Sequence, residues 1–247
     1  MARTTGTDRV GGQKSFSTTH WSVVLAATQT DGPGSLNAWE RLATIYWPPL
    51  YAYIRRSGRR PADAQDLTQS FFAALISRQS LEGLVPGKGR FRSYLLVCLK
   101  NFVADEHRRA QAARRRPETA CFSLDTSTAE GRYQAELVDH ETPESIYERQ
   151  WAAAMVDHAI SRLEAYYLEQ GKGEMFECLA AHLVRDPEAV PHAELAARLG
   201  SSEGAVKNAM YRLRQRFRAF FRKEVAATVA PDEVEDEIRH IHQVLAR

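Results

Sequence analysis

Cationic, amide and aromatic side chains between residues 203 and 222 have the spacing needed to bind a polyanion. At about 100° per residue they fall on one face of a single helix. The side chains on this face are Lys207, Tyr211, Arg214, Gln215, Arg218 and Arg222. Ammonium and guanidinium groups bind phosphate oxygens, and side chains near the start of such a helix can reach base edges. The expected chemistry is therefore non-covalent binding of nucleic acid.

Two helices around a tight turn are needed to position this face. The first is expected at about 192–199 and ends at Gly200, a residue that favours helix C-termini. Ser202 then offers an N-cap oxygen to the second helix. The apolar stripe of that second helix consists of Val206, Met210, Leu213, Phe217 and Phe220. On a lone helix the cations would simply be solvated, but the preceding helix and turn favour a helix-turn-helix, which docks its second helix in the DNA major groove.

Charge is distributed in blocks along the 247 residues, although the net charge is only +2. Residues 88–116 hold nine basic and two acidic side chains, and 198–224 hold eight and two. Between these basic blocks, 118–149 hold eight acidic and two basic side chains. The pattern indicates two contact sites for a polyanion, joined by a segment that avoids it.

The remaining chain predicts helices and no strands. A helix from about residue 36 should be kinked or broken by Pro48 and Pro49 and end at Gly58. Further helices are expected from Pro61, over 91–111 and from about 143, with a break at 171–173. Residues 20–28 and the segment after Pro231 each predict a short helix, whereas 117–142 show no helical period and are interpreted as a linker. The fold class is all-α.

Catalytic interpretations fail on geometry. Residues 83–89 resemble a phosphate-binding loop, but the glycine spacing is one residue short and no strand precedes it. The acids and histidine at 105–107 point in different directions on a helix, as do His240 and His242. We therefore expect no catalytic residue, no metal and no cofactor. No apolar run is long enough to span a bilayer, and a cytoplasmic location without membrane insertion is expected.

Several motifs together resemble the sigma-70 family of RNA polymerase sigma factors. Residues 39–56, PADAQDLTQ at 61–69, GRFRSYL at 89–95 and KNFVADEHRR at 100–109 look like sigma region 2. Residues 150–225, with EGAVKN at 203–208, look like region 4. Because only about thirty residues lie between them, too few for a further domain with its own core, the layout is similar to that of two-domain extracytoplasmic-function (ECF) factors.

The resemblance implies five segments. They are an N-terminal extension with a short helix (1–35), a region 2-like helical domain (36–116), an acidic linker (117–148), a region 4-like helix-turn-helix domain (149–226) and a C-terminal acidic amphipathic helix (227–247). The implied partners are bacterial core RNA polymerase and promoter DNA, and an anti-sigma factor is left open as a third partner. Promoter recognition, strand opening and transcription initiation are the implied functions.

The resemblance also assigns residues to these partners. The polymerase would contact Asp63, Asp66 and Gln69. The minus 10 element would contact Arg90, Arg92, Tyr94, Lys100, Asn101 and Arg108. The minus 35 element would contact Ser202, Glu203, Lys207, Asn208, Tyr211, Arg212, Arg214 and Arg218. Phe91 is expected in the core.

Two other functions remain open at this stage. A stand-alone helix-turn-helix regulator would use the second basic block and never touch polymerase. A nucleic-acid enzyme is disfavoured because no acidic or histidine cluster converges. The C-terminal acidic helix further suggests docking on one of the basic modules, which would weaken DNA binding by the free protein.

Overall fold

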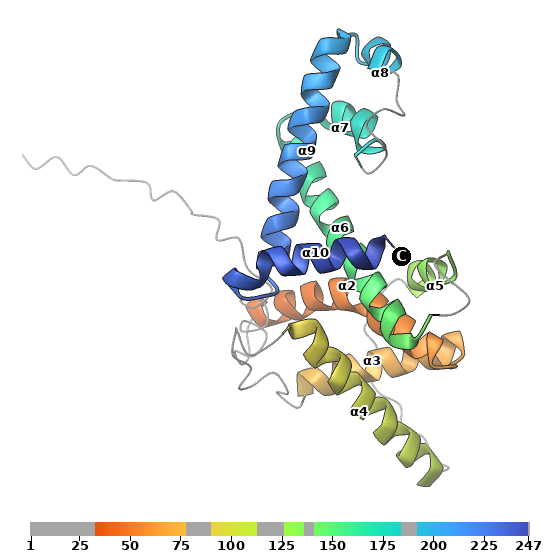
Figure 1. Cartoon of the computed structure of the whole chain (residues 1–247). Coiled ribbons are helices and arrows are strands. Elements are labelled where there is room, and N and C mark those ends of the chain that lie inside the picture. Colours follow the sequence, from red (N-terminus) through yellow and green to blue (C-terminus); the bar gives the residue numbers. More distant parts are fainter. Residues whose placement is uncertain (1–32, 78–89, 113–125, 136–140, 184–191, 247) are drawn as a thin grey trace, which may run out of the picture.

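The computed structural model describes residues 33–77, 90–112, 126–135, 141–183 and 192–246 (Figure 1). These ranges contain α2 (Pro33–Arg56), α3 (Pro61–Ser77), α4 (Phe91–Ala112), α5 (Thr126–Ala135), α6 (Pro143–Glu169), α7 (Gly173–Ala180), α8 (His192–Arg198), α9 (Glu203–Ala226), the 3₁₀ turn η1 (Pro231–Glu233) and α10 (Val234–Leu245). Within the described ranges there is no strand, so the all-α prediction is confirmed. The predicted helix at 20–28 and the loop at 83–89 lie outside the described residues.

Helix ends follow the local signals of the sequence. After α2, Gly58 takes a φ of +88°, which only glycine adopts without strain, and Pro61 occupies the first turn of α3. Thr142 caps α6 by accepting a hydrogen bond from the amide of Ser145. Gly171, at a φ of +66°, ends that helix. The boundaries predicted at Gly58, Pro61 and Gly171 are therefore confirmed.

The proline pair inside α2 does not break the helix, contrary to one of the two expected outcomes. Both Pro48 and Pro49 lie within a continuous Pro33–Arg56 helix. Each proline removes one backbone donor and costs roughly 3 kcal/mol in a helix interior. The neighbouring Trp47, Leu50 and Ile54 are almost completely buried, and this packing offsets the cost.

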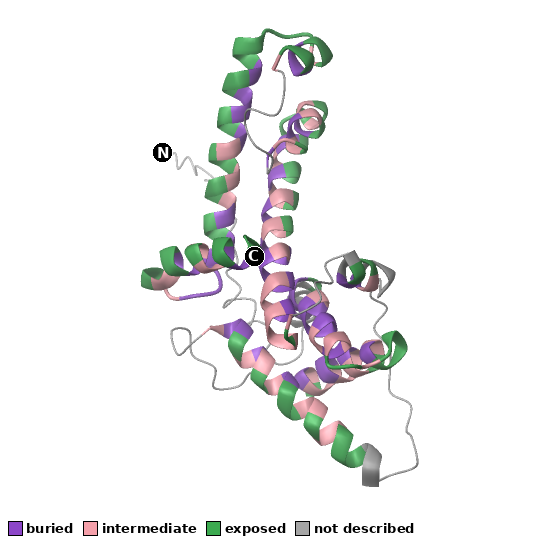
Figure 2. Ribbon diagram, turned by 45° about the vertical axis from the view of Figure 1, so that its right-hand side comes forward, coloured by how far each residue is buried: buried purple, intermediate pink, exposed green. Residues whose placement is uncertain are grey.

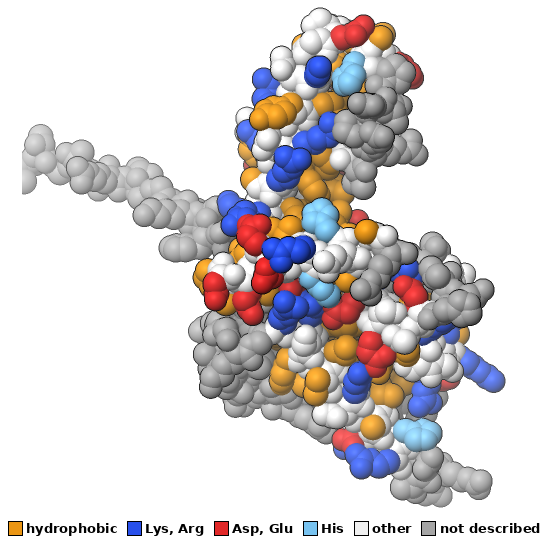
Figure 3. Space-filling model, viewed as in Figure 1, with side chains coloured by type: hydrophobic (Ala, Val, Ile, Leu, Met, Phe, Trp, Pro, Cys, Tyr) orange, Lys and Arg blue, Asp and Glu red, His pale blue; other side chains and the backbone are white. Residues whose placement is uncertain are grey.

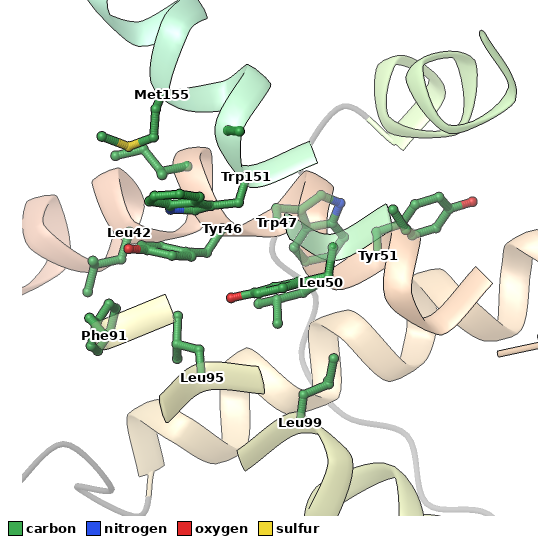
Figure 4. Packing of buried hydrophobic residues seen from close by; sticks show 14 of the residues in the cluster. Leu42, Tyr46, Trp47, Leu50, Tyr51, Phe91, Leu95, Leu99, Trp151 and Met155 are labelled. Atoms are coloured by element: carbon green, nitrogen blue, oxygen red, sulfur yellow. The ribbon is translucent and has the colours of Figure 1, made fainter. Parts of the chain in front are cut away.

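A first core joins α2, α3, α4, α5, the start of α6, the end of α9 and α10. Figure 4 shows its centre, where side chains of α2, α4 and α6 meet. The Tyr46 ring contacts Phe91 edge-on at 5.3 Å between centroids, and Trp47 stacks on Phe72 at 5.8 Å. Trp151 of α6 is completely buried beside them. The predicted core position of Phe91 is therefore confirmed.

A second core lies at the other end of the molecule, between the end of α6, α7, α8 and the start of α9. The long helices α6 and α9 run side by side and contribute to both cores (Figures 1 and 2). On α6, Trp151 belongs to the first core and Leu163 to the second. On α9, Val225 belongs to the first core and Leu213 to the second. The molecule is thus elongated, with α10 crossing near its middle.

The segment expected as a linker without helical structure contains a helix, which corrects that expectation. Helix α5 packs on α2 through the buried Ala129 and Tyr133. Its Glu130 carboxylate accepts hydrogen bonds from Arg55 Nε at 2.9 Å and from the Tyr51 hydroxyl. Only two apolar residues at a spacing of four mark this helix, which is too short a pattern to show a period. The division into five segments itself stays a prediction.

Truncation of a core leucine should test how strongly the first core holds the fold. Leu50→Ala is expected to lower the free energy of unfolding by about 2–5 kcal/mol, because Leu50 is completely buried. Leu168→Ala makes the same change at a side chain that is 59% exposed, and about 0.5 kcal/mol or less is expected. Urea unfolding followed by circular dichroism measures both. Equal losses in the two variants would contradict the assignment of the core.

The docking of α5 should depend on acid pH. Hydrogen bonds from Arg55, with smaller contributions from Tyr51 and Gln134, lower the pKa of Glu130 from its usual 4.5 to about 2, while burial opposes them. Because the pKa is lowered on folding, this stabilisation is fully present above pH 4.5 and is lost as the pH falls towards 2. Glu130→Gln should therefore flatten the pH dependence of unfolding in that window. Urea titrations across the window, with the exposed Glu164→Gln as the unchanged control, provide the measurement.

Candidate nucleic-acid interface

Helices α8 and α9 meet at the turn that the sequence predicted. Gly200 has a φ of +55°, and the Ser201 amide donates to the Ala196 carbonyl at 2.9 Å. Ser202 caps α9 by accepting from the Ala205 amide at 3.3 Å. Leu195 and Ala196 of α8 are buried against the stripe of α9. In that stripe Val206, Met210 and Leu213 are buried and Phe217 and Phe220 are half-buried. This packing fixes which face of α9 points outwards.

The outward face of α9 carries most of the residues assigned to the minus 35 element. Exposed on it and at its start are Ser202, Glu203, Lys207, Asn208, Tyr211, Arg212 and Arg218. Tyr211 is 64% exposed, which is unusual for so large an aromatic side chain. Arg214 is half-buried and donates to the His182 carbonyl at 3.3 Å. The structure thus presents the predicted set on one helix, with Arg214 already occupied within the protein.

Polar and aromatic contacts fasten α9 to α6. The Arg216 guanidinium lies 4.1 Å from the Tyr166 ring centroid, and that of Arg162 lies 5.6 Å from the Phe220 ring. Glu224 is buried between the two helices, where it pairs with Arg162 and, at 2.9 Å, with His158 Nδ1. These contacts hold α9 against its neighbour, which positions its exposed side chains.

Helix α4 presents a second group of predicted residues. Asn101 and Arg108 are exposed, and Arg108 pairs with Asp105 one turn earlier. Lys100 is also exposed but pairs with Glu144 of α6 at 2.7 Å. Tyr94 is half-buried and stacks on Phe91 at 6.3 Å between ring centroids.

The surroundings of Tyr94 also affect its hydroxyl. Burial, helped by a hydrogen bond with Cys98, raises the pKa of Tyr94 to about 12. The phenol and its ring are thus already engaged within the protein, by Cys98 and Phe91. A contact with the minus 10 element stays a prediction for Tyr94 and for the exposed residues of α4.

Arg92 requires a correction, because it is buried and engaged within the protein. Its side chain is only 4% exposed, and its guanidinium lies 4.4 Å from the Trp151 ring centroid. Arg92 Nε donates to Glu148 at 2.8 Å, and a second nitrogen pairs with Glu237 of α10. Burial lowers the pKa of Arg92, and Glu148 opposes this effect. In this arrangement Arg92 cannot touch DNA, because α6 and α10 fold over it.

Arg90 lies beside this buried cluster. Its Nε is 3.1 Å from Glu237 Oε2, and 34% of its side chain is exposed. The two arginines expected at the minus 10 element therefore share one carboxylate from the other end of the chain. Sequence spacing gives no sign of this pairing, because 145 residues separate Arg92 from Glu237.

Helix α3 presents the residues assigned to polymerase. Ala64, Thr68 and Phe71 are buried on one side. Asp63 and Asp66 are exposed on another side, and Gln69 is half-buried. The structure therefore brings the two carboxylates to the surface of one helix, where a cationic partner can reach them.

The described residues form neither a metal site nor a membrane span. Among them, no group of three His, Cys, Asp or Glu side chains is arranged to hold a metal ion. None of the helices within the described ranges combines the length and apolar character of a membrane-spanning segment.

Two buried glutamates were missed by the sequence reasoning, although a signal for them exists. Glu224 continues the buried side of α9, seven residues after Phe217 and four before Thr228. Glu237 lies three residues after Val234 and four before Ile241, within the apolar stripe of α10. A carboxylate inside an apolar stripe is nearly always paired, since burying it alone is costly. Such positions therefore predict internal ion pairs.

Comparison with known families concerns the segment that forms α2 to α4. No curated protein and no solved structure gives a significant match to the chain. Residues 42–113 match the family model of sigma-70 region 2, and this range covers most of α2 and all of α3 and α4. A region 2 implies a part in binding RNA polymerase and melting promoter DNA. Residues 42–113 are therefore similar to sigma-70 region 2, which supports a placement of the chain among the sigma-70 factors.

Proposed function

We propose that this protein is an ECF-type sigma factor that binds bacterial core RNA polymerase and directs promoter recognition, opening and transcription initiation. The observation that carries the proposal is the combination of two modules in one chain. One is the region 2 match at 42–113. The other is the exposed cationic face of α9, which follows a short helix and a capped turn. A stand-alone regulator would explain the second module but leave the first without a role.

Each proposed binding partner is assigned to the exposed side of one helix, α3, α4 or α9. The carboxylates on α3 are the contact for cationic residues of the polymerase. The exposed part of α4 faces the minus 10 element, where unpaired bases can stack on Tyr94. The face of α9 reads the minus 35 element, because the start of a second helix in a helix-turn-helix reaches base edges and later cations reach phosphates. All three tasks are binding, and the polymerase forms the covalent bonds.

Transcription by a reconstituted holoenzyme tests the proposal on whichever promoters the protein selects. Purified core polymerase is incubated with bacterial genomic DNA, with and without the protein, and the 5′ ends of the transcripts are mapped. We expect a defined set of start sites only when the protein is present. Binding of DNA without association with polymerase would instead support the stand-alone regulator.

The contact with polymerase should depend on the α3 carboxylates. Asp63→Asn combined with Asp66→Asn should weaken binding to core polymerase by about 2- to 30-fold, the range expected for two exposed charge pairs. Asp232→Asn removes an exposed carboxylate from η1 and serves as the control. Fluorescence titration of the labelled protein with core polymerase gives each Kd. An unchanged Kd in the double variant would remove α3 from the interface.

Base reading and phosphate binding on α9 should separate in two variants. Lys207→Ala should cost about 1–3 kcal/mol on a promoter sequence selected by the holoenzyme and little on random duplex. Arg218→Ala should weaken binding to both duplexes similarly and reduce the slope of log K against log salt by about 0.9. Arg218 is used because Arg214 is held by the His182 carbonyl.

The control for these variants is Arg239→Ala, since Arg239 is an exposed arginine on α10 that pairs with Asp236. Affinities are measured by fluorescence anisotropy over a salt series. Identical losses for Lys207→Ala on both duplexes would show that Lys207 does not read bases.

A further inference from the structure

Helix α10 brings a buried carboxylate to the start of α4. Glu237 is completely buried, whereas Glu235 and Asp236 beside it are exposed. The carboxylate of Glu237 pairs with both Arg90 and Arg92. Glu148 of α6 completes the cluster, contacting Arg92 at 2.8 Å and His240 Nε2 at 2.9 Å. Glu237 of α10 thus pairs with two arginines at the start of α4.

Carboxylate and phosphate compete for the same kind of group. A guanidinium offers a planar fork of donors that fits either anion in two-point contact. Arg90 Nε lies 3.1 Å from Glu237 Oε2 without hydrogen-bond geometry, so Glu237 attracts Arg90 by charge, and this attraction competes with that of a phosphate. Arg92 is also fixed by Glu148 and Trp151, so it remains in the core when α10 leaves. Arg90, with 34% of its side chain exposed, is the cation that α10 can release.

The same helix also connects the two long helices to the region 2 module. Val234, Ile241 and Val244 of α10 are buried in the first core. The ring of His242 contacts Phe221 of α9 edge-on at 6.5 Å between centroids. Figure 3 shows acidic and basic side chains interspersed over α10, between the column formed by α9 and the lower part of the molecule. Withdrawal of α10 would therefore free Arg90 and remove a helix whose side chains contact both the start of α4 and the end of α9.

We propose that α10 is an intramolecular clasp that masks Arg90 in the free protein and withdraws when polymerase and promoter DNA bind, leaving Arg90 to a DNA phosphate. This inference rests on the proposed function. The clasp keeps DNA affinity low until polymerase is present, because Glu237 engages Arg90 and the apolar face of α10 keeps that carboxylate in place.

Substitution of the buried carboxylate tests the clasp in the full-length protein. Without polymerase, Glu237→Gln should raise affinity for a promoter duplex with an unpaired minus 10 segment by about tenfold, the effect of one charge-assisted contact. Asp232→Asn removes the same charge from an exposed position in η1, just before α10, and should change affinity less than about twofold. Adding Arg90→Ala to Glu237→Gln should abolish the gain. Equal effects of Glu237→Gln and Asp232→Asn, or a gain that survives Arg90→Ala, would overturn the clasp.

Hydrogen exchange on the unmodified protein covers the case in which Glu237→Gln fails to fold. Amides of 234–245 should be protected in the free protein and lose protection when core polymerase and promoter DNA are added. Retained protection in that complex would also overturn the clasp. Transcript mapping separates the two ideas, since specific start sites without any α10 response would leave the proposed function intact and remove only the clasp.

Discussion

The buried guanidinium of Arg92 is the interaction on which the arrangement of the helices depends. Arg92 lies at the start of α4, where its guanidinium stacks over Trp151 of α6 and pairs with Glu148 and with Glu237 of α10. The Tyr147 hydroxyl also donates to the Arg92 carbonyl at 2.8 Å. A buried charge is tolerated only when it is paired, and loss of one partner from such a cluster typically costs about 3–5 kcal/mol. Three helices from distant parts of the chain must therefore meet at one point.

This constraint explains why the two cores are not independent. Helix α6 begins in the first core, where Tyr147 and Trp151 surround Arg92, and ends in the second core at Leu163 and Tyr167. Helix α9 returns along it, with Glu224 tied to Arg162. A boundary at residue 149 therefore falls within the first turns of α6. In the free protein, α6 and α9 lie side by side. The region 2-like helices pack at one end of this pair, and the proposed DNA-reading start of α9 lies at the other end.

Local features of the fold were predictable because their causes are local. Gly58, Pro61, Gly200 and Ser202 each set a helix end through their own backbone or side-chain chemistry. The exposed face of α9 was predictable for the same reason, since a period of 3.6 residues separates its cations from its apolar stripe. The continuity of α2 through Pro48 and Pro49 could not be predicted from the sequence, because it depends on packing by residues from other helices. The burial of Arg92 likewise depends on partners that sequence spacing cannot place together.

The ion pairs in the structure change which charged segments of the sequence are available to bind DNA. Acids of the segment interpreted as a linker pair with cations of α2 and α4, as in Glu130 with Arg55 and Glu144 with Lys100. Glu148 and Glu237 likewise neutralise Arg92. The basic block around α4 is therefore partly neutralised within the protein, while the cations of α9 at Lys207, Arg212 and Arg218 stay exposed. Since phosphate attraction depends on accessible cations rather than on their number in the sequence, the exposed cations of α9 attract DNA more directly than the paired cations in the described part of α4. In the proposed function, contact of Arg90 and Lys100 with DNA would require that Glu237 and Glu144 release them.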